Sequence, residues 1–353
     1  MDLTKDEITQ YSRHLLLKGV GMKGQQKLIK SKVLVIGAGG LGCPILQYLT
    51  AAGVGTIGII DDDLVDISNL QRQILYTHDD IGKPKVTAAK NKLARLNPHI
   101  NIIAHQVLLT TKNALELFNQ YDIIVDGSDN FQTRYLSNDA AVIANKPLVF
   151  GSIYKFEGQV SVFNYENGPT YRCLFPSPPQ PNEVPNCSEV GVLGILPGIV
   201  GSMQANEVLK IILELGNVLS GKLLTYNTLN NAQYILEFVK SQNFQVPTIL
   251  DNYDLFCGIT EQNDELRYED IRNHLDDYFL IDVREPWEHG NKNIGGINIP
   301  VHEMLNSIDS IPLDKPILLY CEIGSRSEIG KQLLKNLIKN AKIYTLKNGI
   351  QSI

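Results

Sequence analysis

The sequence predicts an α/β protein, in which a doubly wound, mostly parallel Rossmann-like sheet is followed by a small second α/β domain. Three observations support this class. A glycine-rich turn follows a short apolar segment at residues 32–36, apolar and helical segments then alternate, and a second alternation begins after residue 263. Such alternation is typical of parallel sheets, because a crossover helix must return the chain before the next strand can pair.

The size and composition of the chain limit its class. At 353 residues it is too long for one ordinary domain core. A net charge of −6 and the lack of a long basic run argue against a nucleic-acid partner. No apolar run reaches the roughly 18 residues that a membrane helix needs, and the N-terminal segment lacks the basic start of a signal peptide. Five scattered cysteines, an odd number, favour a reducing compartment. We therefore expect a cytoplasmic protein without a membrane partner.

The first domain is expected to cover residues 1–245. Thr4 and Glu7 form a capping box at the start of a helix that runs to about Leu17. Short apolar segments rich in β-branched residues then predict β-strands, at residues 32–36, 56–60, 100–105, 123–125, 147–150 and 159–165. A long apolar segment at residues 198–215 predicts a helix.

The second domain is expected to cover residues 264–353. Periodicity is lost between residues 241 and 263, and we assign residues 246–263 as the linker. After it, the alternation of apolar and helical segments predicts two helices, at residues 267–277 and 326–339, and three strands, at residues 278–283, 316–320 and 342–346.

A glycine-rich turn joins the first predicted strand to the helix after it. Gly37, Gly39 and Gly42 match the pattern GxGxxG, and Gly40 also lies in this turn. Its backbone N–H groups and the helix dipole are suited to binding phosphate. Asp61 ends the next strand, where it can bond a ribose hydroxyl. These features predict a nucleotide site without identifying the nucleotide, and taken alone they would favour NAD.

Further polar residues favour nucleotidyl transfer. The set comprises Arg13, Asn69, Arg72, Gln73, Lys85 and Asp129. A dehydrogenase does not need several cations and an extra carboxylate around a pyrophosphate. A nucleotidyl-transfer site does, because cations hold the triphosphate and stabilise the charge that develops on phosphorus, while a carboxylate holds the metal ion.

Residues 8–235 resemble the ubiquitin-activating-enzyme-like adenylyltransferases of the MoeB/ThiF type. The stretches that carry the resemblance include YSRHLLL, VLVIGAGGLGCPILQYLTAAGVG, IIDDDLVDISNLQRQILY, IGKPKV, VDGSDNFQTRYLSND and NCSEVGVLGILPGIVGSMQANEVLK. The resemblance implies that Arg72 and Lys85 contact the triphosphate of ATP and that Asp129 binds magnesium. It also implies a homodimer, in which Arg13 reaches the neighbouring subunit's site.

Three further cysteines relate to this family. Cys187 lies in a loop before a helix start, and the resemblance implies that its thiol forms a thioester or acyl-persulfide with the activated carrier. The family commonly holds a structural zinc ion on two CxxC pairs. Here Cys173 and Cys257 remain, while Thr170 and Asp254 occupy the other two positions. Because structural zinc sites normally use four Cys or His ligands, we expect no bound zinc.

The second domain contains another candidate nucleophile. Cys321 opens the loop CEIGSRS between a predicted strand and a predicted helix. Loop N–H groups, the helix dipole and Arg326 can stabilise a thiolate and then a persulfide anion there. Residues 264–353 resemble the rhodanese family, and Asp282 and Arg284 of its DVRE motif are expected to form a buried ion pair that positions the loop.

Together these features predict an adenylyltransferase that is also a sulfurtransferase. It would adenylylate the C-terminal Gly-Gly carboxylate of a ubiquitin-like sulfur carrier with ATP and magnesium. Cys321 would then deliver sulfur received from a persulfide donor, such as a cysteine desulfurase, to give a thiocarboxylate. Two alternatives are an NAD-linked oxidoreductase with a fused rhodanese module and a non-catalytic nucleotide-binding scaffold.

Overall fold

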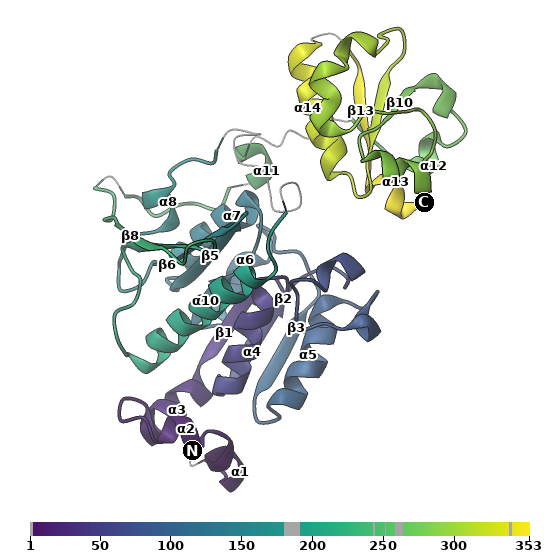
Figure 1. Cartoon of the computed structure of the whole chain (residues 1–353). Helices are drawn as coiled ribbons and strands as arrows, with labels where there is room; N and C mark the ends of the chain where they lie inside the picture. The colour runs from purple at the N-terminus through teal and green to yellow at the C-terminus, as the bar shows by residue number, and fades with distance from the viewer. Residues whose placement is uncertain (1–2, 180–190, 243, 251, 258–263, 339–340) are drawn as a thin grey trace. The chain divides into compact units, whose positions relative to one another are not determined.

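The computed structural model describes residues 3–179, 191–242, 244–250, 252–257, 264–338 and 341–353. The described residues up to 257 form one compact unit, and those from 264 onwards belong to a second. Figure 1 shows the helices and strands of both units. Each unit is α/β with a mostly or wholly parallel sheet, so the predicted fold class is confirmed.

The first unit is built on one eight-stranded sheet in the order β3-β2-β1-β4-β5-β6-β7-β8. The first five strands along the chain run parallel, and the last three are antiparallel. The strands are β1 (Lys32–Ile36), β2 (Thr56–Ile60), β3 (Asn101–His105), β4 (Ile123–Asp126), β5 (Leu148–Tyr154), β6 (Glu157–Phe163), β7 (Lys222–Asn227) and β8 (Gln233–Glu237). The chain reverses its direction of winding between β1 and β4, which is where open α/β sheets bind ligands.

Sequence reasoning missed the last two strands of this sheet. All five residues of β8 are exposed, and β7 buries only Leu223 fully. Neither strand therefore carries the alternation of apolar and polar residues that identifies a half-buried strand.

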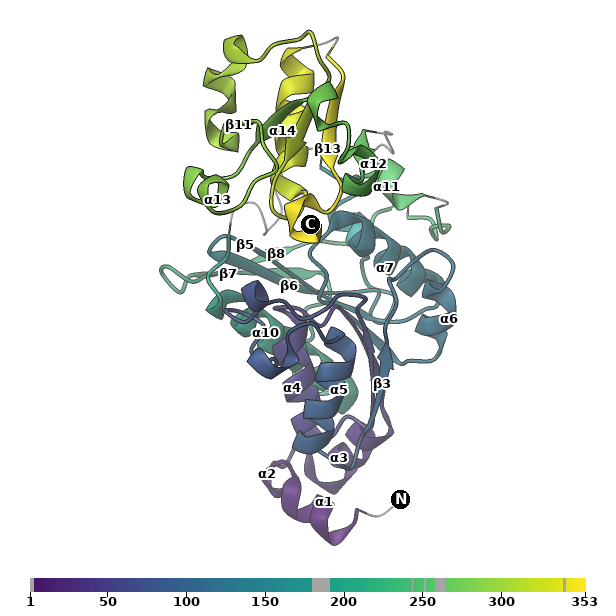
Figure 2. The same cartoon turned by 90° about the vertical axis from the view of Figure 1, so that its right-hand side faces the viewer.

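Helices cover both faces of this sheet (Figure 2). Alternate residues of β1 explain this arrangement, because Val33 and Val35 belong to one hydrophobic cluster while Leu34 and Ile36 belong to another. The first cluster includes residues of α3 (Gly21–Lys30), α4 (Gly42–Ala52), α5 (Lys85–Leu96) and α10 (Ile195–Leu213). The second includes residues of α6 (Ala114–Asn119), α7 (Phe131–Ile143) and α8 (Tyr171–Leu174).

The expected N-terminal helix is interrupted. Thr4 and Glu7 form the expected capping box at the start of α1 (Lys5–Gln10), but this helix ends at Tyr11. A second short helix, α2 (Ser12–Leu15), follows and carries Arg13. The buried Tyr11 side chain accepts a hydrogen bond from Asn97 at 2.8 Å, which holds this break against the body of the unit.

Part of the segment assigned to the linker folds with the first unit. Residues Tyr253–Phe256 form a helix, α11, that contacts α7. Tyr253 and Cys257 are buried in the second hydrophobic cluster. The chain therefore contributes to the core of the first unit up to residue 257.

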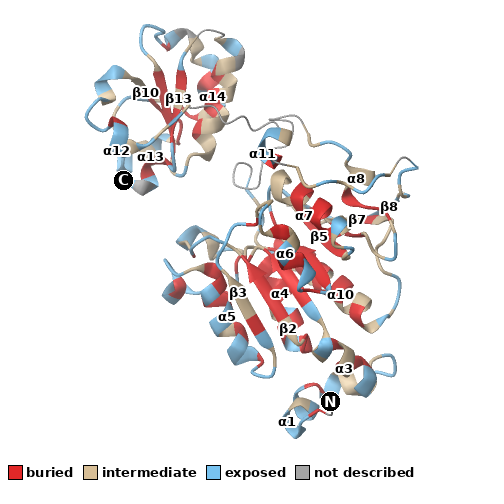
Figure 3. Ribbon diagram, turned by 180° about the vertical axis from the view of Figure 1, so that it is seen from behind, coloured by how far each residue is buried: buried red, intermediate tan, exposed pale blue. Residues whose placement is uncertain are grey.

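The second unit has a five-stranded parallel sheet in the order β11-β10-β12-β13-β9. Its strands are β9 (Glu265–Leu266), β10 (Phe279–Asp282), β11 (Ile297–Asn298), β12 (Ile317–Tyr320) and β13 (Ile343–Leu346), and its α-helices are α12 (Tyr268–Ile271), α13 (Pro286–Asn291) and α14 (Ser325–Leu337). Figure 3 shows the buried residues along the central strands. The helix expected at 267–277 is instead α12 followed by a 3₁₀ turn at Leu275–Asp277.

None of the helices in the described parts of the chain is long and apolar enough to cross a membrane. The long apolar helix α10 instead packs closely against α4 in the first unit. A Cβ atom on Gly201 of α10 would lie 2.5 Å from the carbonyl oxygen of Leu41 and 2.5 Å from Pro44 Cγ. Only glycine permits this approach of the two helices.

We predict opposite effects for alanine at two glycines of α10. Gly201→Ala should lower the free energy of unfolding by about 1–3 kcal/mol, because backbone atoms must move to admit the methyl group. Gly198→Ala should be neutral or stabilise by up to about 1 kcal/mol, because its Cβ would meet only Ile195 at 4.0 Å. Urea unfolding of both variants measures this difference. Equal stability of the two variants would contradict the close contact.

Candidate functional site

The glycine-rich turn lies between the end of β1 and the start of α4. Gly37 has a φ of +88°, a left-handed conformation that favours glycine. A Cβ atom on Gly42 would lie 2.0 Å from the carbonyl oxygen of Gly37. The turn therefore requires glycine at both positions. By contrast, a Cβ on Gly39 would meet only Gln73 Nε2, at 3.7 Å, so the backbone here is open to an approaching ligand.

Asp61 connects the end of β2 to this turn. Its carboxylate accepts hydrogen bonds from the backbone N–H of Ala38 at 2.7 Å and of Asp63 at 2.9 Å. Burial raises the pKa of Asp61, while the nearby charge of Lys85 acts in the opposite direction. On the other side of the turn, the buried hydroxyl of Tyr76 donates to the carbonyl of Ala38 at 2.8 Å. Ala38 is thus held from two directions.

Lys85 supplies a buried cation beside Asp61. It is the first residue of α5, and its side chain is only 7% exposed. Its Nζ lies 2.8 Å from a carboxylate oxygen of Asp63, whose own side chain is 67% exposed. The ammonium group of Lys85 is therefore buried, while the carboxylate of Asp63 can move into solvent.

Arg72 and Gln73 lie beside the glycines of the turn. Arg72 Cγ would lie 3.7 Å from a Cβ on Gly40, and the Arg72 guanidinium donates to the carbonyl of Ser68 at 3.1 Å. Gln73 is buried, and its Oε1 has no hydrogen-bond partner among the described residues. Asn69 plays a structural part, because its Oδ1 accepts from the backbone N–H of Asp66 at 3.1 Å and so closes a 3₁₀ turn.

The end of β4 carries two aspartates with different environments. Asp126 is buried, which raises its pKa; one of its oxygens accepts from Ser128 N at 2.9 Å, and the other has no partner among the described residues. Asp129 is exposed. Asn130 caps α7 by accepting from Thr133 N at 2.8 Å, so Asp129 is not used as the cap.

Sequence reasoning missed two of the polar groups at this edge. Besides Asp126, it overlooked Gln204 of α10, which donates to the carbonyl of Asp126 at 2.7 Å. Each carried a signal, since Asp126 ends an otherwise apolar strand and Gln204 is a fully buried polar residue in an apolar helix. Buried polar groups of this kind normally have a structural or binding role.

Within one protomer, Arg13 lies away from the turn. Arg13 follows Tyr11, which packs against Gly53 at the C-terminal end of α4. The glycine turn is at the N-terminal end of that eleven-residue helix, about 16 Å away. Cys187 lies outside the described residues. Within them, the acidic group compact enough to hold a metal ion is Asp61, Asp62 and Asp63, and Asp129 is not a member.

Cys173 and Cys257 do not fit a zinc site. Cys173 Sγ accepts hydrogen bonds from the backbone N–H groups of Thr170 at 3.4 Å and Ser241 at 3.5 Å. Burial opposes ionisation of Cys173, but these hydrogen bonds leave its pKa lowered. Cys257 is buried in the second hydrophobic cluster, and burial raises its pKa to about 11. Neither thiol belongs to a group of three metal-binding side chains in the described residues.

In the second unit, Cys321 lies between the end of β12 and the start of α14. Its side chain is fully buried. The backbone N–H of Gly324 donates to Cys321 Sγ at 3.1 Å, and Ser327 Oγ lies 3.7 Å from the sulfur. Gly324 has a φ of +101°, which lets the loop curl around the sulfur before α14 begins at Ser325. One loop N–H group therefore contacts the sulfur, and the loop leads into the N-terminus of α14.

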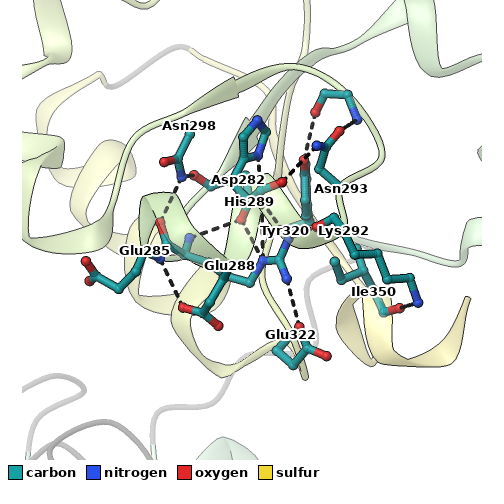
Figure 4. A network of polar contacts seen from close by, with 12 residues as sticks. Asp282, Glu285, Glu288, His289, Lys292, Asn293, Asn298, Tyr320, Glu322 and Ile350 are labelled. Atoms are coloured by element: carbon teal, nitrogen blue, oxygen red, sulfur yellow. Dashed lines mark hydrogen bonds and ion pairs between the residues drawn. The ribbon is translucent and has the colours of Figure 1, made fainter.

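A network of charged side chains supports this loop (Figure 4). The expected ion pair is confirmed, because the fully buried Asp282 and Arg284 meet at 2.8 Å. Arg284 also donates to Glu322 of the loop at 2.8 Å and to the carbonyl of Lys292. Asp282 has a further contact with His289 Nδ1 at 2.9 Å. The network joins β10, α13 and the start of the cysteine loop.

Arg326 has a partner that the sequence did not predict. Both of its terminal nitrogens donate to Glu288 of α13, each at 2.6 Å. The hydrogen bonds from Arg326 lower the pKa of Glu288. Arg326 is thus anchored to a carboxylate, although its charge also interacts with Cys321. Glu288 and His289 lie just after the DVRE motif, separated from it by Pro286 and Trp287, and this proximity was the available signal.

Comparisons with known proteins agree with this arrangement. The model of the ThiF family matches residues 11–247, and that of the rhodanese-like domain matches residues 267–353. Solved structures of MccB from E. coli share the fold of the first unit, for example the complex with MccA-N7isoASN, with a TM-score of 0.60 at 22% identity over 68% of this chain and 74% of that one.

Curated relatives span both units. The probable adenylyltransferase/sulfurtransferase MoeZ of Mycobacterium tuberculosis is 43% identical over 92% of this chain and 87% of its own length. The adenylyltransferase and sulfurtransferase MOCS3 of Anopheles gambiae is 39% identical over 97% of this chain and 84% of its own. The sulfur carrier protein adenylyltransferase of Thermus thermophilus is 50% identical over 73% of this chain and its whole length.

The matches extend over both units. The chain therefore belongs to the ThiF family and carries a rhodanese-like domain at its C-terminal side.

Proposed function

We propose that this protein adenylylates the C-terminal glycine carboxylate of a ubiquitin-like sulfur carrier and then supplies it with sulfur from Cys321. Carriers of the molybdopterin, thiamine or tRNA-thiolation type are the proposed substrates. The names of the relatives that span both units support this combination of activities. In the first step the carboxylate attacks the α-phosphate of ATP, which yields an acyl-adenylate and pyrophosphate.

The observation that carries the proposal is the buried Lys85 beside the glycine turn. Its present partner, Asp63, is largely exposed and can be displaced by a polyphosphate. Arg72, beside Gly40, supplies a second cation. These two cations suit a triphosphate, because negative charge develops at the phosphorus during transfer. A dinucleotide would need only the turn and Asp61. The NAD alternative leaves both cations unexplained.

We assign Asp129 as the magnesium ligand. It is exposed at the carboxyl end of β4, next to β1 in the sheet, and the cap of α7 does not engage it. A carboxylate oxygen is the ligand type that magnesium prefers. When bound, the ion would neutralise charge on the phosphates during the transfer.

In the sulfur-transfer step, the terminal sulfur of a Cys321 persulfide attacks the activated acyl carbon. AMP leaves, or the thiolate of Cys187 if that thiol has first taken the acyl group. A second thiol then attacks Cys321 Sγ, which breaks the S–S bond and releases the thiocarboxylate. The disulfide left on Cys321 must be reduced by an external dithiol before the next cycle. The N–H of Gly324 and the start of α14 stabilise the sulfur anion of the loop. A persulfide donor such as a cysteine desulfurase would reload Cys321.

We further propose a homodimer in which Arg13 completes the partner's nucleotide site. Within one protomer Arg13 and the glycine turn lie at opposite ends of α4. The surface between α4 and α10 contains an apolar depression of about 820 Å³. Its walls include the exposed side chains of Tyr48, Ile74 and Ile195. A second copy of the chain covering this surface would account for both features.

Two single substitutions should separate the two activities. Asp129→Ala should lower carrier-dependent ATP–pyrophosphate exchange by about a hundredfold or more, because a positioned metal ligand is lost. It should still accept sulfur from a sulfane donor on Cys321. Cys321→Ala should show the reverse, with exchange intact and no thiocarboxylate formed. Exchange assays and mass spectrometry of the persulfide measure both. No exchange by the wild-type chain with any carrier would refute the proposal.

Mixing two inactive variants tests the dimer. Arg13→Ala and Asp129→Ala chains, combined and allowed to exchange subunits, should recover part of the exchange activity, because a mixed dimer contains one intact composite site. Each variant alone provides the control. Light scattering should show two chains per particle. A monomeric particle, or a mixture no more active than its parts, would exclude completion of the site by the partner.

A further inference from the structure

The most informative feature outside the two catalytic sites is a buried carboxylate, Asp139 of α7. Its side chain is fully buried and accepts four hydrogen bonds. One oxygen accepts from Arg172 Nε at 2.7 Å and from Asn138 Nδ2 at 2.9 Å. The other accepts from Arg172 Nη2 at 2.7 Å and from the hydroxyl of Tyr253 at 2.7 Å. Both oxygens are therefore satisfied, as a buried charge requires.

The cation in this cluster is also enclosed by aromatic rings. The guanidinium carbon of Arg172 lies 4.9 Å from the ring centre of Tyr135 and 4.9 Å from that of Phe256. Phe256 itself packs edge-on against Tyr135, with ring centres 5.2 Å apart. Because arginine is planar and weakly hydrated, it suits a site where one face is stacked and its edge is hydrogen-bonded.

The members of the cluster come from three helices that are distant in sequence. Tyr135, Asn138 and Asp139 belong to α7, Arg172 to α8, and Tyr253 and Phe256 to α11. The hydrogen bonds of Asp139 span 33 residues to Arg172 and 114 residues to Tyr253. Arg172 and Tyr253 thus fasten α8 and α11 to the same point of α7. The last described residue of this unit, Cys257, directly follows α11.

The same two segments contain the remnants of the cysteine pairs. Arg172 lies between Thr170 and Cys173. Tyr253 directly precedes the stretch from Asp254 to Cys257, and Phe256 lies within it. Thr170 is fully buried, and its N–H and hydroxyl both contact Cys173 Sγ at 3.4 Å. That thiol is already engaged by its own short helix and by Ser241 N. A zinc ion on two thiol pairs would join these segments, but among the described residues neither thiol belongs to a group of three metal-binding side chains.

We propose that Asp139, Arg172 and Tyr253 form a metal-free clasp that joins these segments in place of such a zinc ion. The clasp holds α11 on α7 and so fixes the position from which the chain continues towards the rhodanese-like domain. It makes the attachment of this segment independent of metal supply and of thiol oxidation, since none of its members is a thiol. This role is separate from both catalytic activities.

Zinc content provides the first test, with the full-length protein produced in zinc-supplemented medium. We expect far less than one zinc ion per chain, and no change in hydrogen exchange at residues 253–257 when a chelator is added. One tightly bound zinc ion per chain, lost together with the protection of these residues on chelation, would overturn the proposal.

Hydrogen exchange of two tyrosine variants provides the second test. Tyr253→Phe removes the hydroxyl that donates to Asp139 at 2.7 Å and accepts from the Leu250 N–H at 3.3 Å. It should speed exchange of the Leu255 and Cys257 amides about tenfold, equivalent to about 1.4 kcal/mol. Tyr234→Phe is the matched control, because Tyr234 is 70% exposed on β8. Arg172→Met should speed exchange by about a hundredfold or more, since it leaves a buried carboxylate without its cation. Equal exchange in the two tyrosine variants would refute the clasp.

A thiol variant separates the clasp from a partly formed metal site. Cys173→Ser keeps Arg172, Asp139 and Tyr253 in place, so exchange at residues 253–257 should stay within about twofold of wild type. If Cys173→Ser instead opened this segment as much as Arg172→Met does, the cysteine and not the carboxylate would be the anchor, and the proposal would fail.

Discussion

The first unit depends on one backbone contact, the approach of α4 to the end of β1. A Cβ on Gly42 would come within 2.0 Å of the Gly37 carbonyl, so the turn can close only with glycine there. Closing the turn sets the direction in which α4 starts relative to the sheet. It also places Ala38 between Asp61 and Tyr76, which both hydrogen-bond its backbone. Gln73, Arg72 and Lys85 acquire their positions around a turn of fixed shape. A looser turn would leave the same side chains without a common target.

The second unit places a similar turn between strand and helix around the sulfur atom of Cys321. In both units a strand ends, a short loop with a left-handed glycine follows, and a helix begins within a few residues. In the first unit the backbone at Gly39 is open to an approaching ligand, whereas in the second the N–H of Gly324 is directed at Cys321 Sγ. Helix N-termini favour negative charge in either case. The two turns therefore differ in loop length and in the buried thiol of Cys321. These differences suit the first turn to a phosphate and the second to a sulfur anion.

These local patterns explain what could be predicted from the sequence. The glycine turn, Asp61 and the Cys321 loop lie within short segments whose residue types directly encode their geometry. Glu288, Gln204 and Asp139 could not be found in this way, because each acquires its partner from a helix or strand far along the chain. The edge strands β7 and β8 were missed for a related reason, since exposure removes the alternation that identifies a strand. Contacts that form when distant segments pack together produce little recognisable pattern within any one segment of the sequence.

Lys85 and Arg326 differ in how firmly their ion-pair partners hold them. Asp63, the partner of Lys85, is 67% exposed, so exchanging it for a phosphate costs little, as is usual for ion pairs with an exposed member. Glu288, the partner of Arg326, is only 13% exposed and accepts two short hydrogen bonds. Releasing Arg326 would leave that carboxylate poorly solvated. Lys85 is therefore suited to change partners when substrate arrives, whereas Arg326 acts as a fixed charge that holds the cysteine loop in shape.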